Sequence, residues 1–152
     1  MVLAAVRDDT YNLFLFLHIV AAVVAFASVL LNPMLEAFLR KTEGAETIRD
    51  WSAFNVWYTR LFSLGGLAAL FVTGIIMILL SDDVIEFSES WISLSFLVWI
   101  AMGGVLSAMV LKGQKLMAAG DLSGRSKAVL GNQITSVLVL VALYLMVFKP
   151  GA

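Results

Sequence analysis

Three polar residues, His18, Asn32 and Glu36, interrupt a long apolar stretch that runs from Tyr11 to Arg40. Steps of three or four residues join them into one row, which also contains Ala22, Ala25 and Val29. Residues at this spacing share one face of an α-helix, which we call the polar face of the first helix. Inside a membrane such a face is expected to contact protein rather than lipid, so this is where chemistry is expected.

His18 is the only histidine in the chain, and an imidazole inside a membrane can have three kinds of role. A haem or metal ligand needs a second ligand at the same depth, for which Met77 and Met146 are the soft candidates. A proton carrier needs a relay toward Glu36, and the intervening apolar residues offer none. A structural histidine needs one hydrogen-bond acceptor, such as a backbone carbonyl, Tyr144, Ser93 or Ser95. The candidate cofactor-binding residues are therefore His18, Met77 and Met146, with b-type haem as the candidate cofactor.

A second group of polar residues is expected near the other end of the first helix. Asn32 and Glu36 lie toward that end, and the fourth apolar stretch begins close to Asn132 and Gln133. At one level in the membrane, these four residues would form a polar cluster with hydrogen bonds between helices. Two alternatives stay open: Asn32 satisfies backbone groups that Pro33 leaves free, and the Glu36 side chain extends to the membrane surface.

Four apolar stretches provide the elements that must position these residues. The 152-residue chain is 61% hydrophobic with a mean hydropathy of +0.97, and residues 13–35, 61–80, 92–111 and 129–148 contain no charged side chain. Each stretch reaches the roughly 20 residues that a helix needs to cross a bilayer. The sequence therefore predicts an all-α polytopic membrane protein, a single domain (1–152) with four transmembrane helices in an up-down bundle. The predicted helices are at about 11–40, 57–80, 91–112 and 128–148.

Small residues recur at spacings of four in the second and third predicted helices. Such pairs let two helix backbones approach closely in a membrane. The residues predicted to pack in this way are Gly65, Gly66, Ala69 and Thr73 in the second helix, and Gly103, Gly104 and Ser107 in the third. They predict packing against protein, including a homo-oligomer or other membrane subunits.

Basic residues gather on one side of the predicted membrane. Only Arg7 and Lys149 lie on the other side, whereas the first and third connections carry Arg40, Lys41, Arg49, Arg60, Lys112, Lys115, Arg125 and Lys127. This bias predicts a cytoplasmic (inner) membrane with both termini on the exterior or periplasmic side. Acidic residues alternate with the basic ones, which argues against a nucleic-acid partner and favours the lipid bilayer as the partner.

Short motifs give the chain a resemblance to a loose group of small bacterial four-helix membrane proteins. The motifs are the Leu17-His18 pair, the run AAVVAFASVL with Pro33 at its exit, VTGIIMIL (72–79) and Trp91 at the start of the third helix. The group includes the HemJ-type protoporphyrinogen oxidases, the copper-resistance protein D-like proteins and an uncharacterised family of predicted integral membrane proteins, which the chain resembles most. In HemJ-type enzymes a first-helix histidine binds b-type haem, and His18 matches it. Those enzymes also depend on a lysine early in the third helix, where this chain has none before Lys112, so the resemblance does not extend to their activity.

The sequence contains no recognisable catalytic constellation. It has no cysteine, no phosphate-binding loop, no nucleophile elbow and no paired carboxylates within the predicted helices. The sequence therefore favours a non-enzymatic accessory or scaffold-like protein that acts within a homo-oligomer or a larger membrane complex. The alternatives are a haem- or porphyrin-binding redox protein that uses His18, and an oligomeric carrier of small molecules or ions.

Overall fold

The computed structural model describes residues 9–39, 44–82 and 84–151, and within these all side chains except those of residues 35–39 and 45. The regular secondary structure of these residues is entirely helical, which confirms the predicted all-α class. Four helical stretches are long and apolar enough to cross a membrane: Asp9–Met34, Glu46–Leu79, Ser90–Ala118 and Gly124–Phe148. This is the pattern of a multi-pass membrane protein.

The first and last stretches are single helices, and the middle two each contain a π-helical segment. The single helices are α2 (Asp9–Leu39) and α7 (Gly124–Phe148). In the second stretch α3 (Ala45–Tyr58) continues through η1 (Thr59–Leu64) into α4 (Gly65–Leu79), and in the third α5 (Ser90–Val105) continues through η2 (Leu106–Leu111) into α6 (Lys112–Ala118). The second and third stretches therefore extend beyond their predicted bounds at one end. Both extensions mix polar and apolar residues, so a search for apolar windows ends before the helices do.

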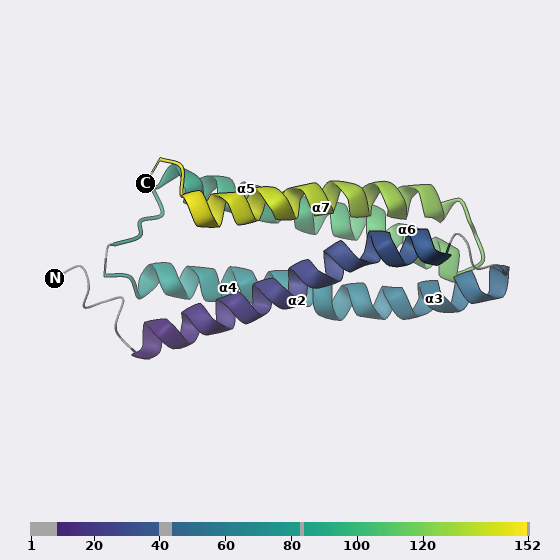
Figure 1. The fold of residues 1–152 in the computed structure, drawn as a ribbon, viewed down its shortest axis with the longest axis horizontal. Helices are drawn as coiled ribbons and strands as arrows, with labels where there is room; N and C mark the ends of the chain where they lie inside the picture. Colours follow the sequence, from purple (N-terminus) through teal and green to yellow (C-terminus); the bar gives the residue numbers. More distant parts are fainter. Residues whose placement is uncertain (1–8, 40–43, 83, 152) are drawn as a thin grey trace.

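The four stretches lie side by side along the long axis of the molecule (Figure 1). The start of α2 and the end of α7 lie at one end, which we call the terminal end. The end of α2, the start of α3 and the α6–α7 connection lie at the opposite end, which we call the loop end (Figure 1).

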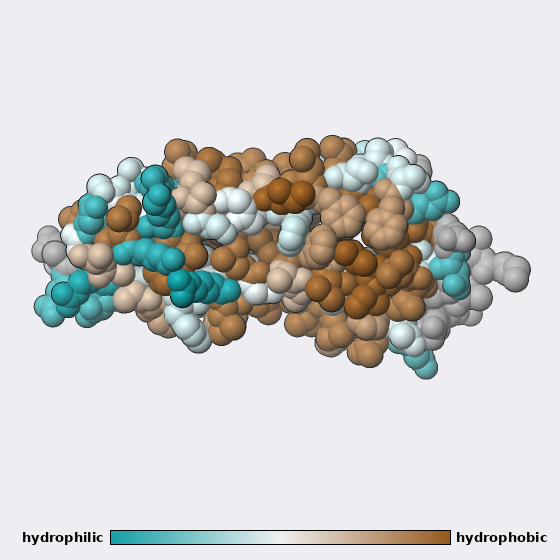
Figure 2. All heavy atoms as spheres, turned by 180° about the vertical axis from the view of Figure 1, so that it is seen from behind, coloured by the Kyte–Doolittle hydropathy of each residue, from teal (hydrophilic) through white to brown (hydrophobic). Residues whose placement is uncertain are grey.

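Apolar side chains cover much of the molecular surface. On the face shown in Figure 2, they form a broad band between polar residues that gather toward the two ends. Phe16, Met34 and Val147 are 61%, 70% and 71% exposed, respectively. Exposure of large apolar side chains on this scale is unusual for a water-soluble monomer and is expected where lipid is the solvent.

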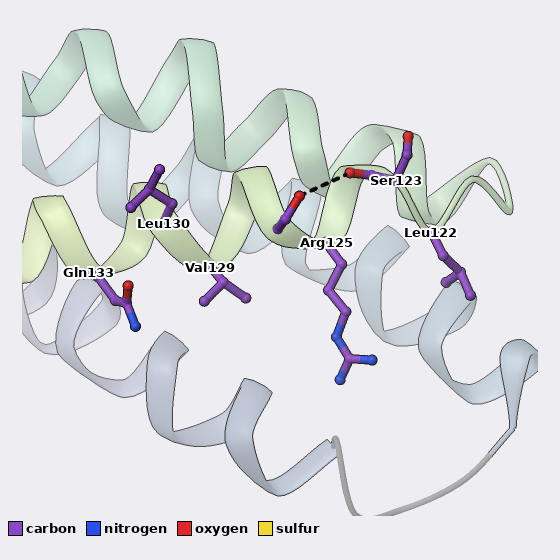
Figure 3. Close-up of a pocket in the computed structure, with 7 residues that line it drawn as sticks. Leu122, Ser123, Arg125, Val129, Leu130 and Gln133 are labelled. Carbon is purple, nitrogen blue, oxygen red and sulfur yellow. Dashed lines mark hydrogen bonds between the residues drawn. The ribbon is translucent and has the colours of Figure 1, made fainter.

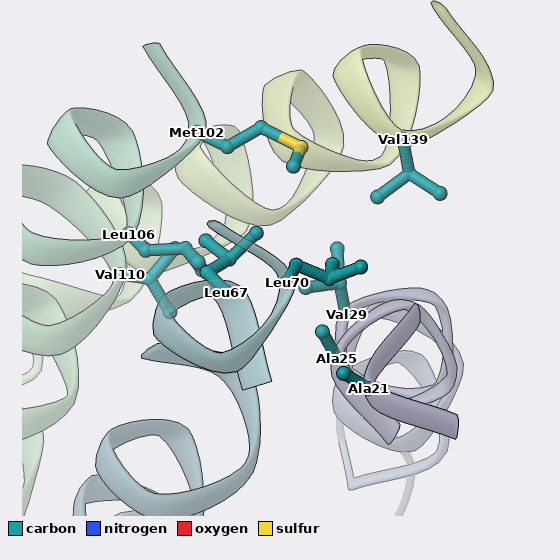
Figure 4. Packing of buried hydrophobic residues seen from close by; sticks show 9 residues of the cluster. All are labelled: Ala21, Ala25, Val29, Leu67, Leu70, Met102, Leu106, Val110 and Val139. Atoms are coloured by element: carbon teal, nitrogen blue, oxygen red, sulfur yellow. The ribbon is translucent and has the colours of Figure 1, made fainter. Parts of the chain in front are cut away.

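The core between the helices is a cluster of apolar residues from α2, α4, α5, η2 and α7 (Figure 4). Its members are Ala21, Ala25, Val29, Leu67, Leu70, Met102, Leu106, Val110 and Val139. Three residues of the polar face of the first helix, Ala25, Val29 and Asn32, are at most 2% exposed. This burial confirms the prediction that the polar face contacts protein.

Glycines allow the closest approaches between helix backbones. A Cβ atom at Gly113 would lie 2.5 Å from the carbonyl oxygen of Gly124, which joins α6 to the start of α7. A Cβ atom at Gly66 would lie 2.8 Å from the Cβ atom of Ala25, at the contact between α4 and α2. Both distances are shorter than carbon atoms tolerate, so only glycine permits these contacts without displacement of a helix.

The seven residues predicted to pack helices divide into three groups. Gly66 and Thr73 are buried and face α2. Among the described residues, no atom of another segment lies within 4 Å of a Cβ position at Gly103 or Gly104. The remaining three, Gly65, Ala69 and Ser107, lie on exposed faces. Contact of these exposed small residues with another subunit remains a prediction.

Candidate functional site

An apolar cavity of ≈ 470 Å³ lies between α2, α4, α5 and α7 and extends to the terminal end of the molecule. We call it the terminal cavity. Its volume falls within the range of roughly 300–1,000 Å³ that is usual for small-molecule sites. His18, Met77 and Met146, the candidate cofactor-binding residues, all line it. The fold therefore brings together three residues that are far apart in the sequence.

Helix α4 holds the imidazole of His18 at the wall of the terminal cavity. Nδ1 of His18 lies 2.9 Å from Oγ1 of Thr73. The Thr73 hydroxyl has one proton, which it donates to the Ala69 carbonyl at 2.7 Å, so its oxygen accepts the bond from His18. Because the Thr73 oxygen acts as an acceptor, this geometry favours the imidazole tautomer protonated at Nδ1, with a lone pair on Nε2.

Aromatic and thioether side chains form much of the remaining wall. The indole of Trp99 donates a hydrogen bond of 2.8 Å to the Leu67 carbonyl and stacks on Phe71, with ring centres 4.4 Å apart. This stack links α5 to α4 and gives the cavity a rigid, flat boundary. Met77 and Met146 add flexible, polarisable sulfur atoms to the lining. Such a lining suits a largely apolar, planar molecule.

A tryptophan and a lysine lie at the terminal end of the cavity. Trp91, in the first turn of α5, is 5% exposed and donates its indole N–H to the carboxylate of Glu89. The Nζ atom of Lys149 lies 5.3 Å from the centre of the Trp91 ring, at cation–π distance. A hydrogen bond of 3.0 Å from the Ser90 hydroxyl to the Pro150 carbonyl ties the end of the chain to α5.

Polar residues continue toward the loop end along the contact between α2 and the second helical stretch. The Ser28 hydroxyl donates to the Ala25 carbonyl at 2.7 Å and lies 2.8 Å from the Ser63 hydroxyl. One turn further along each helix, Asn32 and Thr59 are buried, and their side-chain polar atoms have no hydrogen-bond partner among the described residues. Two hydrogen bonds were predicted for the Asn32 amide, one to backbone groups freed by Pro33 and one to another helix. Among the described residues it makes neither.

Between these polar pairs, Ala25 packs directly against Gly66. The contact lies between the His18–Thr73 pair and the Ser28–Ser63 pair, and its closeness leaves no room for a water molecule. The polar groups of α2 therefore do not form a continuous path for protons at this contact.

The four residues of the predicted polar cluster, Asn32, Glu36, Asn132 and Gln133, differ in burial. Asn32 and Asn132 are buried, whereas Gln133 is exposed. The side chain of Glu36 lies outside the described residues. Successive residues of a helix point about 100° apart, so Asn132 and Gln133 cannot both face the core.

Gln133 instead lines an open hollow of ≈ 690 Å³ on the surface of α7 near the loop end (Figure 3). The Arg125 side chain extends across this hollow, and the Ser126 hydroxyl donates to the Ser123 carbonyl at 3.5 Å (Figure 3). Its lining comes from the α6–α7 connection and the first turns of α7, and it lacks the walls from several helices that surround the terminal cavity. The terminal cavity is therefore the stronger candidate for a functional site.

Comparison of the chain with family models, curated proteins and solved structures found no match. The function is therefore argued from the terminal cavity itself. Among the described residues, no group of three or more His, Cys, Asp or Glu side chains is arranged to hold a metal ion. Among the described residues of the lining, the soft metal-binding groups are the imidazole of His18 and the thioethers of Met77, Met102 and Met146.

Two features of the site were missed by sequence reasoning. The hydrogen-bond partner of His18 is Thr73, which the sequence analysis assigned to helix packing. Of the three side chains predicted as partners, Tyr144 and Ser93 are exposed, and the Ser95 hydroxyl donates to the Trp91 carbonyl. Depth could have identified Thr73, because both residues lie about 10 Å from the terminal ends of their predicted helices. The second missed feature is the position of Lys149 above Trp91, which no pattern in the sequence indicates.

Proposed function

We propose that the protein is a membrane-embedded binding protein that holds a largely apolar, planar ligand in the terminal cavity beside His18. One observation carries this proposal: the only imidazole of the chain borders a cavity of ≈ 470 Å³ whose other walls are mainly apolar. A small number of polar groups in an apolar cavity is typical of sites that orient one ligand. The first candidate class is b-type haem or another porphyrin.

The donors of the cavity fit a haem. With its proton on Nδ1, His18 offers Nε2 as an iron ligand, and the hydrogen bond to Thr73 fixes the ring orientation, as second partners of metal-binding histidines commonly do. Met77 and Met146 are the candidates for a second axial ligand. A bound haem would supply one-electron redox chemistry.

The membrane arrangement is part of the proposal. We infer that the four apolar stretches cross a cytoplasmic (inner) membrane in up-down order, with the terminal end on the exterior or periplasmic side. The basic residues at the loop end support this orientation through the positive-inside bias. The terminal cavity would then lie in the outer leaflet.

A second candidate function is an accessory role in a homo-oligomer or a larger membrane complex. The observation that favours it is an exposed row of small residues in the third helical stretch. Gly104, Ser107 and Ala108 are exposed, and no other segment approaches the Cβ positions of Gly103 or Gly104. Small residues allow helices of different subunits to pack closely in lipid. The two candidates are compatible, because this row and the lining of the terminal cavity share no residue.

Absorption spectra of the protein in mild detergent, oxidised and reduced, test the haem proposal. Cells are supplied with haem precursor, and apoprotein is also titrated with haemin. We expect a Soret band at close to one haem per chain that is lost in His18→Ala. Replacement of the ligating methionine, in Met77→Leu or Met146→Leu, should shift the reduced spectrum, whereas Met34→Leu, which changes a lipid-facing methionine, should not. A wild-type protein that stays colourless under both conditions, or a band that survives His18→Ala, would refute the haem proposal.

A further inference from the structure

Lys149 lies at the terminal end of the cavity and has no carboxylate partner among the described residues. It is part of the cavity lining, and its Nζ atom lies 5.3 Å from the centre of the Trp91 ring. Among the described residues the one ion pair within 4.0 Å joins Arg49 to Asp50, at the other end of the molecule. The charge of Lys149 is therefore available to a ligand.

The backbone holds this lysine in position. Lys149 follows the last residue of α7 and adopts a left-handed conformation, with φ 43° and ψ 57°, that is uncommon for residues other than glycine. Its amide donates to the Leu145 carbonyl at 3.0 Å, and Ser90 binds the carbonyl of the next residue. These contacts keep the end of α7 against the start of α5, where the terminal cavity ends.

The nearby acidic residue is engaged elsewhere. One carboxylate oxygen of Glu89 accepts the indole proton of Trp91, and the other accepts the amide proton of Glu86 at 3.1 Å. Among the described residues of the lining, Lys149 is the only Asp, Glu, Lys or Arg. The cavity thus presents one unpaired positive charge at one end and apolar surface over most of its length.

We propose that the ligand of the terminal cavity is an amphiphile with a carboxylate, which Lys149 binds while the apolar body lies against the cavity wall. This inference rests on the proposed function and names the class of ligand. The propionate of a porphyrin and the head of a long-chain fatty acid share this chemistry. A neutral ligand would gain nothing from the charge of Lys149, and a cationic ligand would be repelled by it.

Tryptophan fluorescence provides a local test. The chain has four tryptophans, and Trp91 and Trp99 line the cavity. In the background Trp51→Phe, Trp57→Phe, the fluorescence of the chain comes from Trp91 and Trp99 alone, and Lys149→Gln controls for quenching by probe that is only dissolved in the lipid. Protein in phosphatidylcholine nanodiscs is titrated with two matched pairs of quenchers: protoporphyrin IX and its dimethyl ester, and dibromostearic acid and its methyl ester.

We expect at least one acid to bind about tenfold or more tightly than its ester, the size of effect given by one hydrogen bond to a charged group. Lys149→Gln should abolish this preference, Lys149→Arg should retain it, and Lys127→Gln, which removes an exposed lysine at the loop end of the same helix, should not change it. The pair that shows the preference identifies the source of the carboxylate.

The outcomes separate this inference from the proposed function. Equal binding of acid and ester to wild type, or a preference that survives in folded Lys149→Gln, would overturn the role of Lys149 and leave the cavity as a binding site. Failure of all four probes to quench Trp91 and Trp99 would overturn the cavity proposal itself for both ligand families. Native secondary structure of each variant is checked by circular dichroism.

Discussion

Two adjacent glycines of α4 offer a direct test of how the site is held together. Gly66 packs against Ala25 of α2, whereas its neighbour Gly65 is exposed and meets only the carbonyl of Arg60, at 3.6 Å from a Cβ position. Replacement of either residue by alanine adds the same methyl group to the same helix. The two variants therefore differ in what the methyl group contacts.

The expected magnitude follows from the contact distances. In Gly66→Ala the new Cβ would lie 2.8 Å from the Cβ of Ala25, and ordinary contacts begin at 3.4 Å, so α2 and α4 must separate by about 0.6 Å. Overpacking of this kind costs about 1–3 kcal/mol. Alanine also favours helix over glycine by about 1 kcal/mol, equally in both variants. We therefore expect Gly66→Ala to have a free energy of unfolding about 1–3 kcal/mol below that of Gly65→Ala.

Reversible unfolding by SDS in mixed micelles measures this difference. A second readout reports on the site, because the single histidine of the chain gives one set of imidazole signals in ¹⁵N NMR. Separation of the helices at Gly66, two turns from Thr73, should lengthen the His18–Thr73 hydrogen bond and shift the Nδ1 signal in Gly66→Ala but not in Gly65→Ala. Equal stability of the two variants within about 0.5 kcal/mol, with unchanged imidazole signals, would refute the reasoning.

Three further predictions concern polar groups. A double-mutant cycle of Ser28→Ala and Ser63→Ala should give a coupling free energy of about 0.6 kcal/mol, measured by the same unfolding assay, because their hydroxyls form a buried interhelical hydrogen bond; zero coupling would contradict the bond. Asn32→Leu should raise the free energy of unfolding by about 1–3 kcal/mol, since its buried amide has no described partner, and a loss of stability would show that the amide is satisfied. The Ser123 hydroxyl and amide hold the pKa of Asp121 below its ordinary value. The Asp121 carboxylate therefore stabilises the folded protein fully above about pH 4, and this contribution is lost as the pH falls through the folded-state pKa. A ¹³C titration of Asp121 should give a lower midpoint than in Ser123→Ala, and identical midpoints would exclude the interaction.

Hydropathy alone was enough to predict the helical elements, because the cost of an unpaired backbone in lipid leaves few alternatives. The burial of the polar face of the first helix was equally predictable, since His18, Ala25, Val29 and Asn32 lie on one side of the helix whatever it contacts. Helix ends were less predictable. They depend on contacts between helices, such as that of Gly113 with Gly124, which the hydropathy of a single segment does not reveal.

The composition of the site could be predicted only in part. His18, Met77 and Met146 were selected because they combine ligand chemistry with similar depth, and both properties can be read from the sequence. The cavity itself could not be predicted, because it depends on the distances between α2, α4, α5 and α7. The role proposed for Lys149 depends on a left-handed residue after α7, where the sequence has lysine rather than the usual glycine.

The position of the cavity follows from the unequal sizes of residues along the helices. Toward the loop end, Gly113, Gly124 and Gly131 let the third stretch and α7 approach at backbone distance. Toward the terminal end, rings such as those of Phe71 and Trp99 fill the space between α4 and α5 and hold these helices apart. Four helices that are close at one end and separated by large rings at the other enclose a cavity at the wider end.

A ligand that fills this cavity would bind only the folded chain, so at 100 times its Kd it should stabilise the protein by about 2.7 kcal/mol. Gly74 lies beside His18, so the variant Gly74→Leu should fill the cavity with a side chain. If a carboxylate amphiphile stabilises the wild type but not this variant, the unequal packing of the helices is linked directly to binding.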